Sequence, residues 1–202
     1  MNIPVVFLLV VLGCSQAEGV SKCELRDLVL TELQNLQDGG LSLDPKVVTT
    51  RIVCHAEKSS NFNTSAVTTQ GSDGGSSSNR KKRNTMEDML EIMESEGMRT
   101  TTVQPKKTVK ATQKWTFYGI FQLGNLLVCT DEVSTDPEIC NYNCNTLIDD
   151  DITNDIRCLT DIIRKLLKDG FNQGSRFMEM IRLIYDSECD GFVYSDYFQE
   201  CQ

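Results

Sequence analysis

The sequence predicts a mainly helical protein with a small β part, held together by disulfide bonds. Several segments carry apolar residues at helical spacing, whereas Trp115 to Gln122 has the residues of a strand followed by a turn. Strand-like segments are few. Nine cysteines in 202 residues, eight of them after residue 17, are typical of a secreted chain with a disulfide framework. The length is sufficient for one domain with a sizeable core.

Residues 1–17 predict a cleaved signal peptide. The apolar run from Ile3 to Leu12 is shorter than the roughly 20 residues that cross a bilayer. Small side chains, Ser15 and Ala17, stand at the cleavage positions after it. Cleavage would remove Cys14 and leave an even number of cysteines. One histidine and no paired CxxC argue against a zinc site. We therefore expect a secreted chain, residues 18–202, with no transmembrane segment.

Apolar periodicity and end signals define the helices. The first opens at Cys23 and stops at Gly39-Gly40, and the second starts with Asp44 as cap and Pro45 at its first position, running to Cys54. A long helix follows Cys158. Weaker patterns predict further helices over residues 85–93 and 177–184.

The composition of residues 65–114 predicts that this segment is an insertion. Ser, Thr and Gly dominate its first part, which cannot bury enough apolar surface to offset the entropy of ordering. The segment is interpreted either as a loop extension, which adds little closure cost, or as non-coding sequence retained in the reading frame. Its basic run, Arg80, Lys81, Lys82 and Arg83, is interpreted either as a proprotein cleavage site or as a solvated charged stretch.

The acidic stretch from Asp149 to Asp155 is the strongest chemical signal. Five acidic or amide side chains fall within seven positions, and such oxygen ligands select a hard cation, Ca²⁺ rather than Mg²⁺ in an irregular loop. The spacing is not that of an EF-hand. Acidic residues before a helix also favour its dipole, so composition alone leaves a cation site and a helix cap equally open. The formal net charge of −9 argues against nucleic-acid binding.

Several motifs together resemble the c-type lysozyme/α-lactalbumin family (glycoside hydrolase family 22). The acidic loop is very similar to the α-lactalbumin calcium loop, and the resemblance covers most of the mature chain except residues 65–114. It is carried by Lys22-Cys23-Glu24-Leu25, Ser60-Asn61-Phe62-Asn63-Thr64, Tyr118-Gly119-Ile120-Phe121-Gln122, Leu147 to Ile156, and the spacing of Cys129, Cys140, Cys144 and Cys158.

The resemblance implies an α+β fold, mainly α, with an α-domain, a small β-subdomain and a cleft between them. It implies four disulfides: Cys23–Cys201, Cys54–Cys189, Cys129–Cys144 and Cys140–Cys158. It also implies Ca²⁺ as a cofactor, held by side chains of Asp149, Asn154 and Asp155 and by carbonyls of Thr146 and Asp151. The position of Asn154 is usually Asp in α-lactalbumin, which predicts weaker binding.

Both catalytic positions of the family are substituted. The general-acid position is Ser59 and the second carboxylate position is Phe117. Glu57 is a weak substitute, because two residues along a helix turn a side chain by about 200°. Leu127 and Val128 replace the aromatic residues that would support a sugar. We therefore expect a protein without muramidase activity; the alternative is an active lysozyme that hydrolyses peptidoglycan.

The expected function is binding of an extracellular protein or saccharide by a monomer. The positions through which α-lactalbumin contacts its galactosyltransferase do not match: they hold Glu57-Lys58 and Phe198-Gln199. Asn63-Thr64-Ser65 is a glycosylation sequon, with Asn63 as the acceptor. The sequence does not name the partner.

Overall fold

The computed structural model describes residues 19–40, 42–70, 115–129, 139–169, 182 and 186–201. The predicted signal peptide, the basic run and the predicted helix over residues 85–93 lie outside these residues. Of the predicted helix over residues 177–184 only Arg182 is described, and it is helical. Within the described ranges, no helix is long and apolar enough to cross a membrane.

Two N-terminal helices begin at the predicted positions. α1 (Lys22–Asp38) follows Ser21, whose hydroxyl oxygen accepts a hydrogen bond from the Glu24 N–H. α2 (Pro45–Ser60) follows Asp44, whose carboxylate accepts from the N–H groups of Lys46 and Val47. α2 runs six residues beyond the predicted end at Cys54, so the general-acid position, Ser59, lies on its last turn.

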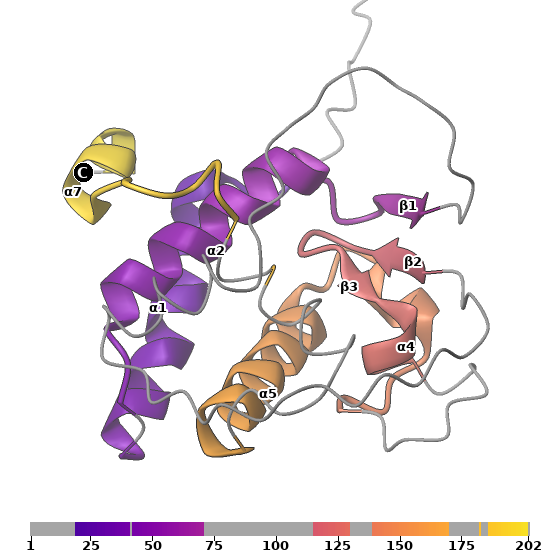
Figure 1. Cartoon of the computed structure of the whole chain (residues 1–202). Coiled ribbons are helices and arrows are strands. Elements are labelled where there is room, and N and C mark those ends of the chain that lie inside the picture. The colour runs from indigo at the N-terminus through magenta and orange to yellow at the C-terminus, as the bar shows by residue number, and fades with distance from the viewer. Residues whose placement is uncertain are drawn as a thin grey trace, which may run out of the picture.

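The core forms between α1 and α2 and where α1 meets α5 (Thr153–Asp169), and Figure 1 shows the three helices. Each helix buries residues spaced three or four apart, which form one apolar face. From α1 these are Leu25, Val29, Leu33 and Leu36, and from α5 they are Ile156, Leu159, Ile162, Ile163 and Leu166. Each such side chain contributes about 1.5–3 kcal/mol when fully buried.

A three-stranded antiparallel sheet lies beside the helices (Figure 1). Its order is β1 (Val67–Gln70), β2 (Trp115–Tyr118) and β3 (Leu123–Gly124), and β3 leads directly into the short helix α4 (Asn125–Val128). β1 lies inside the range predicted as an insertion. Its pairing with β2 places residues 67–70 in the sheet.

The four disulfides pair as the resemblance implied. Cys23–Cys201 and Cys54–Cys189 tie α1 and α2 to the C-terminal segment, which contains α7 (Tyr194–Tyr197) and η2 (Gln199–Cys201). Cys129–Cys144 and Cys140–Cys158 pin the segment around η1 (Cys144–Leu147). The α+β, mainly α class is confirmed by the helices, the small sheet and the four disulfides.

Candidate functional site

The acidic loop connects η1 to α5. Asp149, Asp150 and Asp151 are exposed on it, whereas Asp155, in the first turn of α5, is only 1% exposed. The disulfides of Cys144 and Cys158 hold the two sides of the loop. The chain therefore turns one carboxylate of the acidic stretch inward.

Asp155 is buried without compensation. Within the described part of the chain, neither of its carboxylate oxygens has a hydrogen-bond partner. Burial raises the pKa of this carboxyl to about 8, and the nearby negative charges of Asp149 and Asp151 add to the shift. A buried, unpaired carboxylate is costly, and the residue either stays protonated or binds a cation.

A glycine turn covers Asp155. Gly119 has φ +72°, and a Cβ built there would lie 2.7 Å from Asp155 Oδ1 and would overlap the Leu147 carbonyl oxygen. Only a residue without a side chain lets the backbone approach this closely. The Tyr118-Gly119 turn and the acidic loop thus form one packed unit.

Hydrogen bonds connect the other predicted ligands to one another. The Asn154 side-chain N–H donates to the Thr146 carbonyl at 2.7 Å, and the Asn154 amide oxygen accepts from the Asp155 N–H at 2.9 Å. Asp149 Oδ1 accepts from the Asp151 N–H at 2.9 Å. The fold therefore gathers the predicted ligand residues in one loop. Both the N–H and the oxygen of the Asn154 side-chain amide are already hydrogen-bonded within that loop.

The helix-cap interpretation applies to a different carboxylate of the loop. Asp151 Oδ1 accepts a hydrogen bond from the Thr153 N–H at 3.1 Å, where α5 begins. Hydrogen bonds from the Thr153 side chain and backbone lower the pKa of Asp151. The two interpretations left open by composition thus fall on separate residues, Asp151 as a cap and Asp155 as the cation candidate.

The donor set fits a hard cation only if neutral oxygens take part. No group of three or more His, Cys, Asp or Glu side chains is arranged for metal binding within the described ranges. A cation here would be held by Asp149 and Asp155 with the Asn154 amide oxygen and the carbonyls of Thr146 and Asp151. Mixed carboxylate, amide and carbonyl oxygens are the ligands that Ca²⁺ accepts.

The two positions predicted from the resemblance to be catalytic hold no acid. Ser59 donates its hydroxyl proton to the His55 carbonyl oxygen at 2.7 Å, within its own helix. Phe117, on β2, is 2% exposed, and its ring stacks on Trp115 with centroids 6.0 Å apart. The Arg182 guanidinium lies 4.2 Å from the Phe117 ring centroid. An aromatic ring with a guanidinium beside it thus stands where the sequence predicted the position of the second carboxylate.

Glu57 is engaged elsewhere. The Tyr197 hydroxyl donates to Glu57 Oε2 at 2.6 Å, which joins α2 to α7. Burial, together with the hydrogen bond and charge of Glu57, raises the pKa of Tyr197. Glu57 therefore faces the C-terminal segment rather than the sheet.

Gln122 supports the site and was missed by the sequence analysis. It is buried at φ +50°, and its amide N–H groups donate to the carbonyls of Gly119 and Ala66 at 2.9 and 3.2 Å. Its amide oxygen accepts from the Thr68 hydroxyl at 2.5 Å. Gln122 thus fixes the turn over Asp155 and ties it to β1; in the sequence it was only one letter of a family motif.

Comparison with known proteins defines the family. The sequence model of the C-type lysozyme/alpha-lactalbumin family matches residues 77–182, just over half of the chain. Alpha-lactalbumin from Bubalus bubalis is 29% identical over 154 residues, which cover 75% of this chain and 72% of that protein. Human alpha-lactalbumin is 43% identical over 49 residues, 24% of this chain and 34% of that protein.

Among solved structures, a lysozyme from Litopenaeus vannamei is 25% identical, with a TM-score of 0.47, and the match covers 92% of this chain and 98% of that one. A lysozyme from Equus asinus is 22% identical, also with a TM-score of 0.47, and covers 90% of this chain and 97% of that one. The family-model match identifies the chain as a member of the C-type lysozyme/alpha-lactalbumin family.

Proposed function

We propose that this protein is a secreted, calcium-binding member of its family that lacks muramidase activity and acts by binding a protein or saccharide. The observation that carries the proposal is Asp155, a buried carboxylate without a hydrogen-bond partner among the described residues, in a loop of oxygen donors. Bound calcium supplies positive charge that compensates this carboxylate. The residues that would hold it are those predicted from the sequence.

Loss of hydrolysis is supported by the chemistry of both catalytic positions. Glycoside hydrolysis in this family needs one carboxylic acid to protonate the leaving oxygen and a second, ionised carboxylate. Ser59 and Phe117 offer neither, and Glu57 is held by Tyr197. The alternative, an active lysozyme, would need Glu57 to leave that hydrogen bond and reach the sheet side of α2.

Clearing of bacterial cell-wall suspensions separates these alternatives. With calcium present we expect no clearing above a buffer blank, whereas an active c-type lysozyme run in parallel clears the suspension. Robust clearing that Glu57→Gln abolishes would establish the displaced-carboxylate enzyme and refute the proposal. Tyr197→Phe is a useful companion, because it frees Glu57 without removing its carboxylate.

Calcium removal tests the cation site. A ligand that binds only the native state stabilises it by about 2.7 kcal/mol when its free concentration is about 100 times Kd. We expect EDTA to lower the melting temperature of the wild type and to have little effect on Asp155→Asn. Asp150→Asn is the matched control, since Asp150 is an exposed loop carboxylate outside the predicted ligand set. An unchanged wild-type melting temperature would refute calcium binding.

The sequon lies on the surface in a favourable turn. Asn63 is exposed, and its side-chain oxygen accepts hydrogen bonds from the N–H and hydroxyl of Ser65 at 3.0 and 2.9 Å. We expect Asn63 of the secreted protein to carry an N-linked glycan. Enzymatic removal of N-linked glycans should increase the gel mobility of the wild type and of Ser65→Thr, but not that of Asn63→Gln or Ser65→Ala. No mobility change in any of them would refute this modification.

The partner is expected to be extracellular and is the least defined part of the proposal. Pull-down from extracellular fluid with calcium present, compared with the same experiment in EDTA, selects partners that need the folded loop. Asp155→Asn serves as the reference bait. A wild-type bait that retains only what this variant retains would argue against a calcium-dependent binding role.

A further inference from the structure

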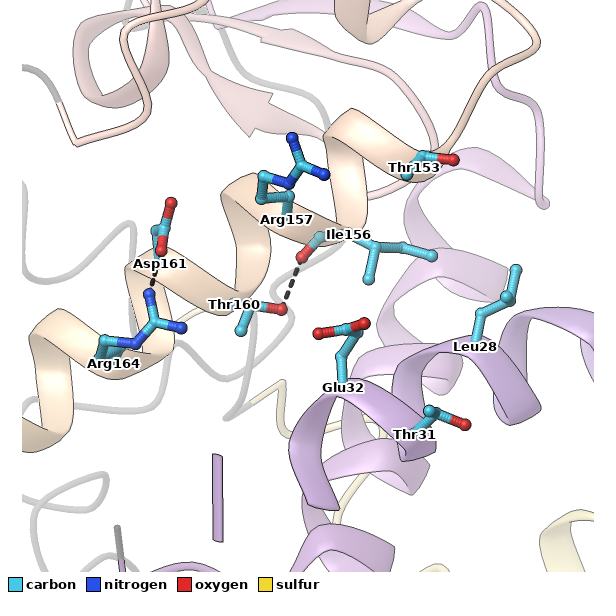
Figure 2. A pocket seen from close by; sticks show the side chains of 9 residues that line it. All are labelled: Leu28, Thr31, Glu32, Thr153, Ile156, Arg157, Thr160, Asp161 and Arg164. Carbon is cyan, nitrogen blue, oxygen red and sulfur yellow. Dashed lines mark hydrogen bonds and ion pairs between the residues drawn. The ribbon is translucent and has the colours of Figure 1, made fainter. Parts of the chain in front are cut away.

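A cavity opens between α1 and α5, and none of the predicted calcium ligands lines it, although Thr153 and Ile156 on its wall are close to Asp155 in sequence. Its volume is about 510 Å³, within the range of roughly 300–1,000 Å³ that is common for small-molecule sites. The lining residues come from one face of each helix, and Figure 2 shows the two helices facing each other across it. Nothing in the proposed calcium or partner binding uses this cavity.

One end of the cavity offers only hydrogen-bond acceptors. Glu32 projects from α1 toward α5, where Thr160 lies in the opposite wall (Figure 2). Thr160 already donates its hydroxyl proton to the Ile156 carbonyl at 2.7 Å, and Thr31 donates its own to the Asp27 carbonyl at 2.8 Å. The remaining lone pairs and the Glu32 carboxylate can therefore only accept, which selects a ligand group rich in N–H donors.

A positively charged side chain, that of Arg157, lies on the α5 side of the cavity. Both the Arg157 and the Glu32 side chains are exposed, and within the described part of the chain neither has an ion-pair or hydrogen-bond partner. The other two charged lining residues, Asp161 and Arg164, pair with each other (Figure 2). The rim of the cavity thus carries one carboxylate and one guanidinium, both exposed to solvent and neither engaged in an ion pair among the described residues.

Apolar surface lies between the helices. Leu28 on α1 is 40% exposed although it is a large hydrophobic residue, and Ile156 on α5 stands opposite it in the cavity wall. In Figure 2 both side chains point into the space between the helices. A ligand that covers Leu28 removes this apolar surface from water, which favours binding.

We propose that this cavity binds a small zwitterion with an apolar body, of about the size of a dipeptide. Its ammonium group would be received by Glu32 with the acceptor hydroxyls of Thr31 and Thr160. Its carboxylate would be received by Arg157, and its apolar side chains would cover the exposed side chain of Leu28, next to the buried Ile156. A ligand with two charges of one sign would meet repulsion at one end.

Titration with L-leucyl-L-leucine, followed by amide chemical shifts of the full mature protein in calcium buffer, tests the proposal. We expect the shifts to concentrate in α1 and the first three turns of α5, with Kd near or below about 1 mM. N-acetyl-leucyl-leucine lacks the ammonium and leucyl-leucinamide lacks the carboxylate. Each should bind about tenfold more weakly, the order expected for loss of one charge-assisted contact.

Two variants test which residue binds the ammonium of the ligand and which binds its carboxylate. Glu32→Gln should weaken the binding of leucyl-leucine about tenfold but should leave the binding of N-acetyl-leucyl-leucine unchanged. Arg157→Gln should weaken the binding of leucyl-leucine by a similar factor but should leave the binding of leucyl-leucinamide unchanged. Asp38→Asn and Lys168→Gln, exposed charges elsewhere on the same helices, should change nothing. All four substituted side chains are on the surface, so unchanged melting temperatures are expected.

Absence of shifts in α1 and α5, equal binding of the three probes, or insensitivity to both cavity variants would each overturn the proposal. These outcomes are independent of the calcium proposal, because that one is read from the effect of EDTA on the melting temperature. A protein that fails to bind calcium but binds leucyl-leucine between α1 and α5 would refute only the former.

Discussion

Gly119 illustrates how one residue supports the site. Its φ of +72° is a conformation that side-chain-bearing residues rarely adopt, and the missing Cβ leaves room for the Leu147 carbonyl and the Asp155 carboxylate. Two separate requirements, conformation and space, therefore meet at the same position.

Gly119→Ala should destabilise the protein by about 3 kcal/mol or more, because the left-handed conformation and the overlap each cost about 1–3 kcal/mol. Gly40→Ala isolates the first cost. Gly40 has φ +88° and a Cβ there would meet no atom within 4 Å among the described residues, so we expect a loss of about 1–2 kcal/mol. Urea unfolding measures both. Equal losses in the two variants would show that the approach to Asp155 is not tight.

Asn154 has a second role that a carboxylate lacks. Its amide N–H donates to the Thr146 carbonyl, so in the absence of an ion the loop keeps a hydrogen bond that an ionised Asp could not make. The substitution that lowers the expected calcium affinity therefore stabilises the ion-free loop.

Asn154→Asp should bind calcium more tightly, by about tenfold or more, since a carboxylate replaces an amide among the ligands. Without calcium the same variant should be less stable than wild type by about 1–3 kcal/mol, through loss of the hydrogen bond and added repulsion between carboxylates. Calcium titration calorimetry and urea unfolding in EDTA measure the two effects. A variant that is more stable than wild type in EDTA would contradict this account of Asn154.

At the level of elements, the first turn of α5 should make stability depend on pH. Without calcium, the Asp155 carboxyl has a pKa of about 8 in the folded chain against 3.8 for an ordinary Asp, so the native state binds more protons between these values. Its contribution to stability is therefore complete below about pH 4 and is lost as pH rises toward about 8.

In EDTA, the wild type should lose stability relative to Asp155→Asn as pH rises from about 4 to about 8, by as much as a few kcal/mol. The gap in melting temperature between calcium and EDTA should widen over the same interval, because the ion replaces the proton on the carboxylate. Thermal unfolding of both proteins across this range provides the measurement. A constant difference between them would mean that Asp155 does not titrate there.

The starts of α1 and α2 were better predicted than the end of α2, whereas α5 begins at Thr153, five residues before Cys158, after which its start was predicted. Ser21 and Asp44 mark where α1 and α2 begin through local hydrogen bonds, which depend only on neighbouring residues. α2 continues to Ser60 because its last turns bury His55 and Ala56 against parts of the chain that are distant in sequence. β1 was missed for the same reason: its pairing partner, β2, is more than 40 residues away.

For the whole molecule, the disulfides decide what a cut in the chain would do. Cleavage at residues 80–83 would separate α1, α2 and β1 from the remainder, and Cys23–Cys201 and Cys54–Cys189 both join these two parts. The cleavage interpretation of the basic run therefore predicts one band on a non-reducing gel of the secreted protein and two bands after reduction. A single band under both conditions would eliminate cleavage and leave a solvated charged run.

By itself the sequence indicated the main helices and the position of the acidic loop, because these depend on residue identity and local spacing. The disulfide pairing came from the family resemblance, and the substitution of both catalytic positions stays a prediction. Only the tertiary structure decided which carboxylate is buried. Asp155 is enclosed by a glycine turn that comes from another segment, while Asp151 caps a helix within its own. The direction of Glu57 toward Tyr197 and the cavity between α1 and α5 were also decided there. Burial and charge pairing depend on contacts between segments that are distant in sequence, and the local spacing of residues does not predict those contacts.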